Sequence, residues 1–248
     1  EALNTLWKRY EMAAQKVLSQ TPKLTNAGLT AADVVKLGKL IMGNVGAKRI
    51  MGKHKLMDWI KELEKLKLKP DELKRVIEGL KSNDSQTLMG ELFRLRVCQQ
   101  QGWKNVDKLE LGVGKTTKYF DNTSNTWKSG YERYIDIVKV GNKYIEVKYY
   151  GNLLQKEVGE VNKFLTQIQK DLKVLKNEPF HYHFAQTKGI PNQQALHQQI
   201  KQVLTDGAYR NKTSKGVEIW KNSLNKQNKP YHSVDEFITD KFKLIKLD

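Results

Sequence analysis

Residues 131–150 read YERYIDIVKVGNKYIEVKYY, and this stretch decides how the rest of the chain is interpreted. Apolar and polar residues alternate on both sides of Gly141 and Asn142, a dipeptide that is typical of the tight turn between two antiparallel strands. Side chains on a strand point alternately to its two faces, so every second residue shares a face. The stretch therefore predicts a β-hairpin with one apolar face and one face rich in charge.

Three charged residues of this hairpin are expected to meet at one place. Glu146 and Lys148 alternate with apolar residues on the second strand, as Asp136 does on the first. Pairing the two strands symmetrically about the turn brings Asp136 close to both of them. A register shifted by one residue would move one set to the opposite face, and the sequence leaves that alternative open.

Two carboxylates within a few ångströms of each other repel unless a cation lies between them. Mg²⁺ suits such a pair, because it binds one or two carboxylates together with waters and substrate phosphates. A bound metal makes hydroxide from water, and a neighbouring lysine stabilises developing charge or holds the attacking water. Asp136, Glu146 and Lys148 are thus candidate catalytic residues for phosphodiester cleavage. The alternative is an ordinary half-exposed strand whose charges are solvated.

Asp136, followed after nine residues by Glu146-Val147-Lys148, resembles the motif of the PD-(D/E)XK nuclease superfamily, which has the restriction-endonuclease-like fold. Ile135 stands where many members have proline, although many others lack that proline. The resemblance covers residues 83–187 and implies a helix, a three-stranded meander, a second helix and a further strand. It also implies a divalent metal held by Asp136 and Glu146, with Mg²⁺ expected first and Mn²⁺ or Zn²⁺ as alternatives.

The resemblance assigns roles outside the hairpin as well. The first helix of the fold often carries a glutamate that completes the metal site, and Glu91 occupies such a position on the helix predicted before Gly102. In several subgroups a glutamine on the helix after the hairpin supports the site, which makes Gln167 a catalytic candidate in the helix predicted over residues 155–176. For both residues, a side chain that merely faces solvent is the alternative.

The 248-residue chain carries 44 Lys and Arg against 27 Asp and Glu, a formal net charge of +17. This charge favours a polyanionic partner, either nucleic acid or an anionic surface, and says nothing about catalysis. No stretch is apolar over the length that a bilayer requires, so we expect no stable membrane span. Basic residues outside the hairpin are candidate contacts to nucleic-acid phosphates: Lys115, Lys118, Lys128, Arg210 and Lys212.

Residues 1–80 have apolar residues at helical spacing, and we predict a helical N-terminal domain there, with translocation as one interpretation of its role. A nuclease domain is predicted over residues 81–248. The fold class is therefore α/β (α+β), a helical region followed by a restriction-endonuclease-like core whose mixed β-sheet is flanked by helices. The glycine-rich stretch 37–51 favours tight helix packing or loops, with a transient contact to a membrane or partner as the alternative.

A helical leader followed by a small basic nuclease resembles the C-terminal toxin region of a bacterial contact-dependent growth inhibition effector. The chain begins with Glu1 and Ala2 and has no initiating methionine, which we interpret as a fragment of a longer protein or a processed product. The resemblance implies an antibacterial nuclease that is delivered from a secreted or cell-surface effector into the cytoplasm of a target cell. It also implies a cognate immunity protein that neutralises the nuclease.

Two other functions stay open at this stage. A stand-alone cytoplasmic restriction or repair endonuclease is the alternative among enzymes, and a non-catalytic basic nucleic-acid-binding module is the alternative of another class. The substrate is open too, because DNA and RNA, including tRNA, present the same phosphate to such a site and base recognition depends on loops.

Overall fold

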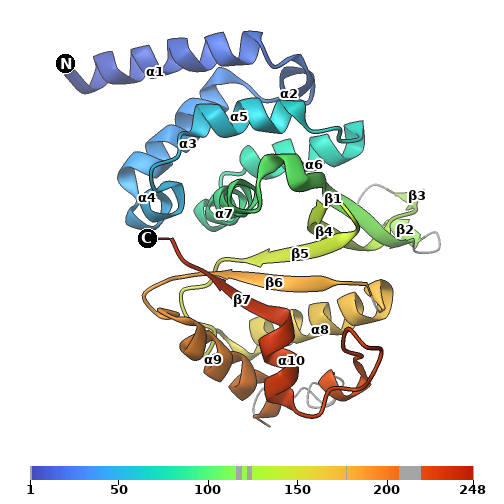
Figure 1. Cartoon of the computed structure of the whole chain (residues 1–248). Helices are drawn as coiled ribbons and strands as arrows, with labels where there is room; N and C mark the ends of the chain where they lie inside the picture. The colour runs from blue at the N-terminus through green and yellow to red at the C-terminus, as the bar shows by residue number, and fades with distance from the viewer. Residues whose placement is uncertain (1, 116–118, 122–124, 177, 207–218, 248) are drawn as a thin grey trace. The chain divides into compact units, whose positions relative to one another are not determined.

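The computed structural model describes residues 2–115, 119–121, 125–176, 178–206 and 219–247 (Figure 1). No helix in these ranges has both the length and the apolar character that crossing a lipid bilayer requires.

The chain divides into two compact units. The sequence places a domain boundary after residue 80, but the first unit continues to Glu110 because the helix Ser85–Gln101 packs against helices that precede it. The first unit comprises Glu1–Glu110, Ile137–Val140 and Leu247–Asp248, and the second comprises Leu111–Asp136 and Gly141–Lys246.

The first unit is built mainly from helices, as the sequence predicts. Buried residues at helical spacing, such as Trp59 and Leu63, form its core, and this burial stabilises helices that would be marginal in isolation. The helices are α1 (Ala2–Ser19), α2 (Pro22–Asn26), α3 (Ala31–Gly43), α4 (Val45–Met51), α5 (Leu56–Lys65), α6 (Pro70–Leu80) and α7 (Ser85–Gln101).

Side-chain caps fix where several of these helices begin. The Thr30 side chain accepts a hydrogen bond from the Asp33 N–H, while the Asp33 carboxylate accepts from the Thr30 N–H, a capping box that starts α3. Asn44 caps α4 with a single hydrogen bond, in which its Oδ1 accepts from the Ala47 N–H, and it also follows the last residue of α3, so it ends one helix and begins the next. The glycine-rich stretch 37–51 thus lies in two helices that pack against each other, so of the two predicted alternatives the structure has helix packing and not loops.

Five strands form one sheet in the spatial order β1-β4-β5-β6-β7, and it is mixed, as the sequence predicts. A three-residue connection joins β4 to β5, which makes them an antiparallel hairpin, whereas β5, β6 and β7 are parallel neighbours. The strands are β1 (Val106–Lys115), β4 (Tyr131–Lys139), β5 (Lys143–Lys148), β6 (Phe180–Ala185) and β7 (Phe242–Ile245), and β2 (Tyr119–Asp121) pairs with β3 (Thr126–Lys128) in a separate antiparallel ribbon.

Three helices of the second unit lie beside β6 and β7 in Figure 1: α8 (Val158–Leu175), α9 (Gln193–Thr205) and α10 (Val234–Lys241). Short 3₁₀ turns occur at Trp103–Asn105 (η1) and Trp220–Asn222 (η4). Phe164 fixes α8 on the sheet, since its ring meets Tyr182 of β6 and Phe242 of β7 edge to face, with centroid separations of 6.2 and 6.5 Å. The face of α8 that carries Phe164 therefore also faces the β4–β5 hairpin.

Candidate active site

Asp136 of β4 and Glu146 of β5 lie next to each other, because each carboxylate accepts a hydrogen bond from the backbone of the neighbouring strand. The Val147 N–H donates to Oδ2 of Asp136 over 2.9 Å, and the Asp136 N–H donates to Oε1 of Glu146 over 3.1 Å. The two side chains therefore take the place of carbonyl groups as acceptors between the strands, and Glu146 is left only 4 % exposed.

Burial of Glu146 has a direct electrostatic consequence. Loss of water raises the pKa of this carboxyl well above its ordinary value, and the nearby Asp136 carboxylate raises the pKa further. Lys148 and Arg133 act in the opposite direction, because each stabilises the ionised form of Glu146. The structure thus holds two carboxylates together at a place where extra positive charge would be stabilising.

Gln167 of α8 joins the glutamate to the lysine. Its amide Nε2 donates to Oε2 of Glu146 over 2.8 Å, and its Oε1 accepts from Nζ of Lys148 over 2.7 Å. One side chain therefore restrains both partners, and the amide orientation follows from the two bonds together. Sequence reasoning left the direction of Gln167 open, and the structure directs it into the hairpin.

A second layer of charged residues lies behind Glu146, and sequence reasoning missed it. Nη2 of Arg133 lies 3.0 Å from Oε2 of Glu146, and Nε of the same guanidinium lies 2.5 Å from Oδ1 of Asp171. The Tyr182 hydroxyl donates to Oδ2 of Asp171, whose side chain is fully buried. Burial raises the pKa of Asp171, while the hydrogen bond and the positive charge of Arg133 lower it. This chain of contacts holds Oε2 of Glu146, the same oxygen that accepts from Gln167.

Helical spacing could have identified Asp171 in advance. It follows Gln167 by one turn and the buried Phe164 by two turns, so it falls on the buried stripe of α8. A carboxylate on a buried stripe needs a partner, and Arg133 in the charged hairpin is the natural candidate. No local pattern predicts the Tyr182 contact, because it depends on the parallel pairing of β5 with β6, which aligns Glu146 with Tyr182.

Glu91 lies in the first unit, on α7, and its carboxylate pairs with Arg94 one turn further along the same helix. Arg94 also pairs with Glu110 of β1, so a nearly buried guanidinium joins two carboxylates here as well. Across the described ranges, His, Cys, Asp and Glu side chains form no group of three or more that could hold a metal ion. Glu91 belongs to the first unit and Asp136 to the second, so the role of Glu91 in completing the metal site stays a prediction.

A hollow of about 260 Å³ lies beside Gln167 within the second unit. Tyr150, Lys156 and Lys163 contribute to its lining, and Nζ of Lys156 lies 5.1 Å from the centre of the Tyr150 ring. Cations beside an aromatic ring suit the phosphate and base of a nucleotide. The sequence analysis did not select these three residues, although they follow the Lys148 strand closely.

The predicted phosphate-contacting residues are placed only in part. Lys115 is exposed at the end of β1. Lys128 ends β3, and its side chain falls outside the description. Lys118, Arg210 and Lys212 lie outside the described residues.

The donor set at Asp136 and Glu146 fits a hard divalent cation such as Mg²⁺. Two oxygen-bearing side chains approach each other on adjacent strands, and Mg²⁺ needs no more than one or two protein carboxylates, since water and phosphate supply its other ligands. The two carboxylates would ligate the ion, while Lys148 and Gln167 lie close enough to act beside it.

Models of protein families, curated proteins and solved structures were compared with this chain, and none of them matches.

Proposed function

We propose that this chain is a metal-dependent nuclease that hydrolyses phosphodiester bonds in nucleic acid. One observation carries the proposal: Asp136 and Glu146 are adjacent on a hairpin, and the Lys148 ammonium is tied to Glu146 through Gln167. The PD-(D/E)XK resemblance supports the same assignment, because these residues occupy the positions of its motif.

In this proposal Asp136 and Glu146 hold the metal, with Mg²⁺ first and Mn²⁺ or Zn²⁺ as alternatives. When bound, such an ion supplies a hydroxide from water and neutralises charge on the phosphate oxygens. Burial and Asp136 raise the pKa of Glu146, whereas Lys148 and Arg133 favour the ionised form that the ligand role requires, and a bound cation would favour that form further. Asp171 positions Arg133 in turn.

Lys148 is the residue of this chain that meets the negative charge developing on the cleaved phosphate. A lysine is a compact charge on a flexible stem, so it needs a partner to hold it in place. Gln167 accepts one of its N–H groups and leaves the others available for a phosphate oxygen or the attacking water. Gln167 is therefore a positioning residue for both Lys148 and Glu146.

Substrate binding in this proposal relies on charge and stacking. The net charge of +17 attracts a polyanion, and Lys156 and Lys163 line the hollow beside Gln167, where they can contact backbone phosphates. Tyr150 offers a ring for a base. Phosphate contacts of this kind serve DNA and RNA, including tRNA, equally well.

The wider context of the proposal is an antibacterial toxin that acts in a target cell and is neutralised by a cognate immunity protein. It rests on the resemblance of arrangement to contact-dependent growth inhibition effectors. A restriction or repair endonuclease would use the same hairpin. Loss of viability on expression, restored by a protein encoded beside this one, distinguishes the toxin from the other two.

The deciding experiment incubates the purified protein with plasmid DNA and, separately, with total tRNA, in Mg²⁺, Mn²⁺, Zn²⁺ or EDTA. Glu146→Gln and Lys148→Met are compared with Lys143→Met, which removes an exposed lysine from the same strand. We expect metal-dependent cutting that both site variants lose and the control keeps. Binding without cutting in every metal would favour a binding module, and cutting that survives EDTA and both site variants would overturn the assignment.

A further inference from the structure

The helical first unit contains a hollow of about 630 Å³ that the proposed nuclease site does not use. It lies among α1, α3, α4 and the start of α5, and all of its lining residues fall between Leu6 and Met57. Protein interiors are packed like organic crystals, so a space of this size within a small helical unit is unusual. Its volume lies in the range of small-molecule sites, which is about 300–1,000 Å³.

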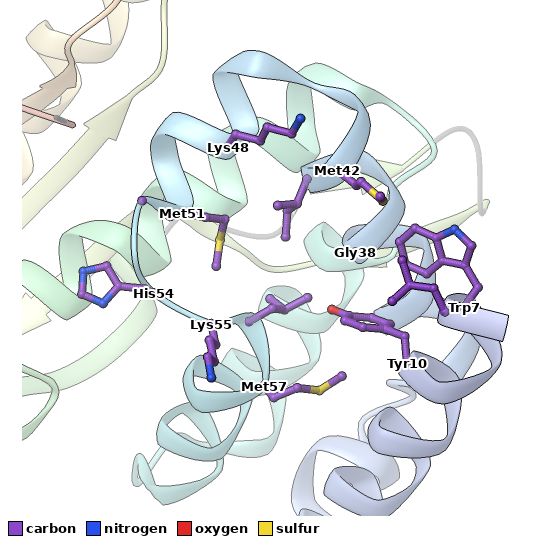
Figure 2. Close-up of a pocket in the computed structure, with 13 residues that line it drawn as sticks. Trp7, Tyr10, Gly38, Met42, Lys48, Met51, His54, Lys55 and Met57 are labelled. Carbon is purple, nitrogen blue, oxygen red and sulfur yellow. The ribbon is translucent and has the colours of Figure 1, made fainter. Parts of the chain in front are cut away.

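The lining is mostly apolar, and several of its side chains are flexible. Met42, Met51 and Met57 contribute flexible thioethers, and Figure 2 shows the side chains of Met51 and Tyr10 directed into the space between the helices. Methionine side chains adjust to irregular apolar ligands because they are unbranched and polarisable. Leu6 and Met42 remain 46 % and 47 % exposed, so the mouth itself is apolar. Exposed apolar surface of this kind marks a ligand or partner site.

Gly38 allows one wall of the hollow to form. A Cβ atom at this position would lie 2.6 Å from the Tyr10 ring, so glycine lets the ring approach α3 this closely. Trp7 packs against Tyr10 edge to face, with ring centroids 5.4 Å apart, and extends the wall along α1. The Tyr10 hydroxyl makes no hydrogen bond within the described chain, and burial raises the pKa of this phenol, so it stays a neutral donor at physiological pH.

The charged side chains that line the hollow are all positive. Lys48 and Lys55 are exposed lining residues, and the described part of the chain gives neither of them a carboxylate partner. No acidic residue appears among the described lining residues. His54 also lines the hollow, and desolvation together with Arg96 lowers the pKa of its imidazole, which leaves it neutral at pH 7. An apolar space with two cations and one phenol donor at its boundary is complementary to an anionic amphiphile.

We propose that this hollow binds a single-chain anionic amphiphile of the long-chain fatty-acid class. The hydrocarbon chain occupies the space beside Met51 and Leu56, and the carboxylate lies at the mouth, where the Tyr10 hydroxyl donates to it. Lys48 and Lys55 lie on opposite sides of the hollow in Figure 2, and their positive charges attract the anionic group. The ligand satisfies the phenol and covers the exposed apolar mouth. This site is independent of the nuclease proposal, since it uses residues of the first unit only.

The test measures binding of oleate to the whole chain by calorimetry, below the concentration at which oleate aggregates. Saturated fatty acids of increasing length and uncharged oleyl alcohol are compared with it. We expect one site per chain, an affinity that rises up to about fourfold for each added methylene, and binding of the alcohol weaker by about tenfold or more. Equal affinity for the alcohol and oleate, or no dependence on chain length, would overturn the proposal.

Two pairs of variants separate this site from general attraction to a basic protein. Ile41→Trp fills the hollow, and Met12→Trp adds the same bulk at an exposed position of α1 outside the lining. The double variant Lys48→Gln/Lys55→Gln removes the two positive charges that line the hollow, and Lys61→Gln/Lys74→Gln removes two exposed lysines elsewhere in the same unit. We expect about tenfold weaker oleate binding in the first member of each pair, and less than a twofold change in the second.

Other outcomes count against the proposal. Equal losses within both pairs would show nonspecific binding, as would binding only to anionic vesicles. Binding of an acidic amphipathic peptide at this hollow without binding of oleate would assign it to a protein partner instead. If Ile41→Trp melts at a lower temperature than the parent, the lysine pairs, which alter exposed side chains only, decide the result.

Discussion

Each unit of this protein contains a guanidinium held between two carboxylates. In the first unit Arg94 joins Glu91 of its own helix to Glu110 of β1, and in the second Arg133 of β4 joins Glu146 of β5 to Asp171 of α8. An arginine held between two carboxylates is therefore not in itself a sign of catalysis. Such a cluster links secondary-structure elements, and the free energy lost when its charges leave water cancels much of their Coulombic attraction.

What differs is the surroundings of the carboxylates. Glu146 has the Asp136 carboxylate beside it and is linked through Gln167 to an ammonium group. The functional candidate is therefore the cluster in which a carboxylate lies beside a second carboxylate and is linked to a lysine.

The largest expected effect separates the two clusters by activity. Glu146→Gln removes a metal-binding charge, and we expect cleavage to fall by about a thousandfold or more, as happens when electrostatic catalysis is lost. Glu110→Gln makes the same chemical change in the other cluster and should leave the cleavage rate within about twofold. Initial rates on plasmid DNA and tRNA measure both. Comparable losses in the two variants would contradict the distinction.

The next effect concerns stability. Arg94→Met and Arg133→Met each leave two carboxylates without their buried cation, which we expect to cost about 3–5 kcal/mol of unfolding free energy. The clusters should then differ in rescue: Mg²⁺ is expected to raise the melting temperature of Arg133→Met and to leave that of Arg94→Met unchanged. Thermal melts with and without Mg²⁺ provide the measurement. A rescue of both variants, or of neither, would count against a metal at Glu146.

A pH experiment compares one histidine from each unit. Burial, with a contribution from Lys241, lowers the pKa of His181 to about 4 from an ordinary value of 6.5. The unfolded chain therefore binds more protons than the folded chain between these values, so stability is lost as the pH falls from 6.5 towards 4, by up to about 3 kcal/mol. His181→Asn should flatten this part of the stability profile in urea titrations.

His54→Asn is the matched change in the first unit. The pKa of His54 is also lowered, by burial first and then by Arg96, but the ring is close to solvent, so the profile should change less than in His181→Asn. A larger change in the stability profile of His54→Asn would show that the histidine of the second unit is not the more desolvated of the two.

The smallest expected effect tests the link between glutamate and lysine. Gln167→Leu keeps the size of the side chain but removes both hydrogen bonds, and we expect cleavage to fall by about 10- to 100-fold, as for other residues that orient a site. Gln202→Leu, at an exposed position of α9, serves as the control. A shift in the metal concentration needed for half-maximal rate would show that the amide acts through Glu146; an unchanged rate would remove Gln167 from the site.

The predictable parts of this molecule are those encoded over short distances. Helical spacing and caps such as Thr30 identify the long helices, and alternation identifies the hairpin, because these signals depend on neighbours in sequence. The short helices α2 and α4 escape, since one or two turns carry too little periodicity. The strand β7 escapes as well, because parallel pairing with β6 joins segments that are far apart in the chain.

In the candidate site, too, the contacts that depend on neighbouring residues are the predictable ones. Proximity of Asp136 to Glu146 follows from one tight turn, so the sequence was sufficient to predict it. The direction of the Gln167 side chain depends on how Phe164 packs α8 against the sheet. The partner of the Glu91 carboxylate depends on whether a lysine, an arginine or a metal lies nearest to it in space. Arg94, one turn along the helix, could have been proposed as that partner from spacing alone.

One feature of the sheet bears on when the site is completed during synthesis. Tyr182 supports Asp171, and its ring stacks on Phe242 of β7, with centroids 5.0 Å apart and planes inclined by 13°. We expect a chain that stops before Phe242 to expose the Tyr182 ring to solvent, which tyrosine fluorescence and proteolysis would detect. When the whole β4–β5 hairpin has been translated, Tyr182 and Phe242, which support it through Asp171, have not yet been synthesised. The nascent protein therefore stays unfinished at its proposed active site until translation passes Ile245.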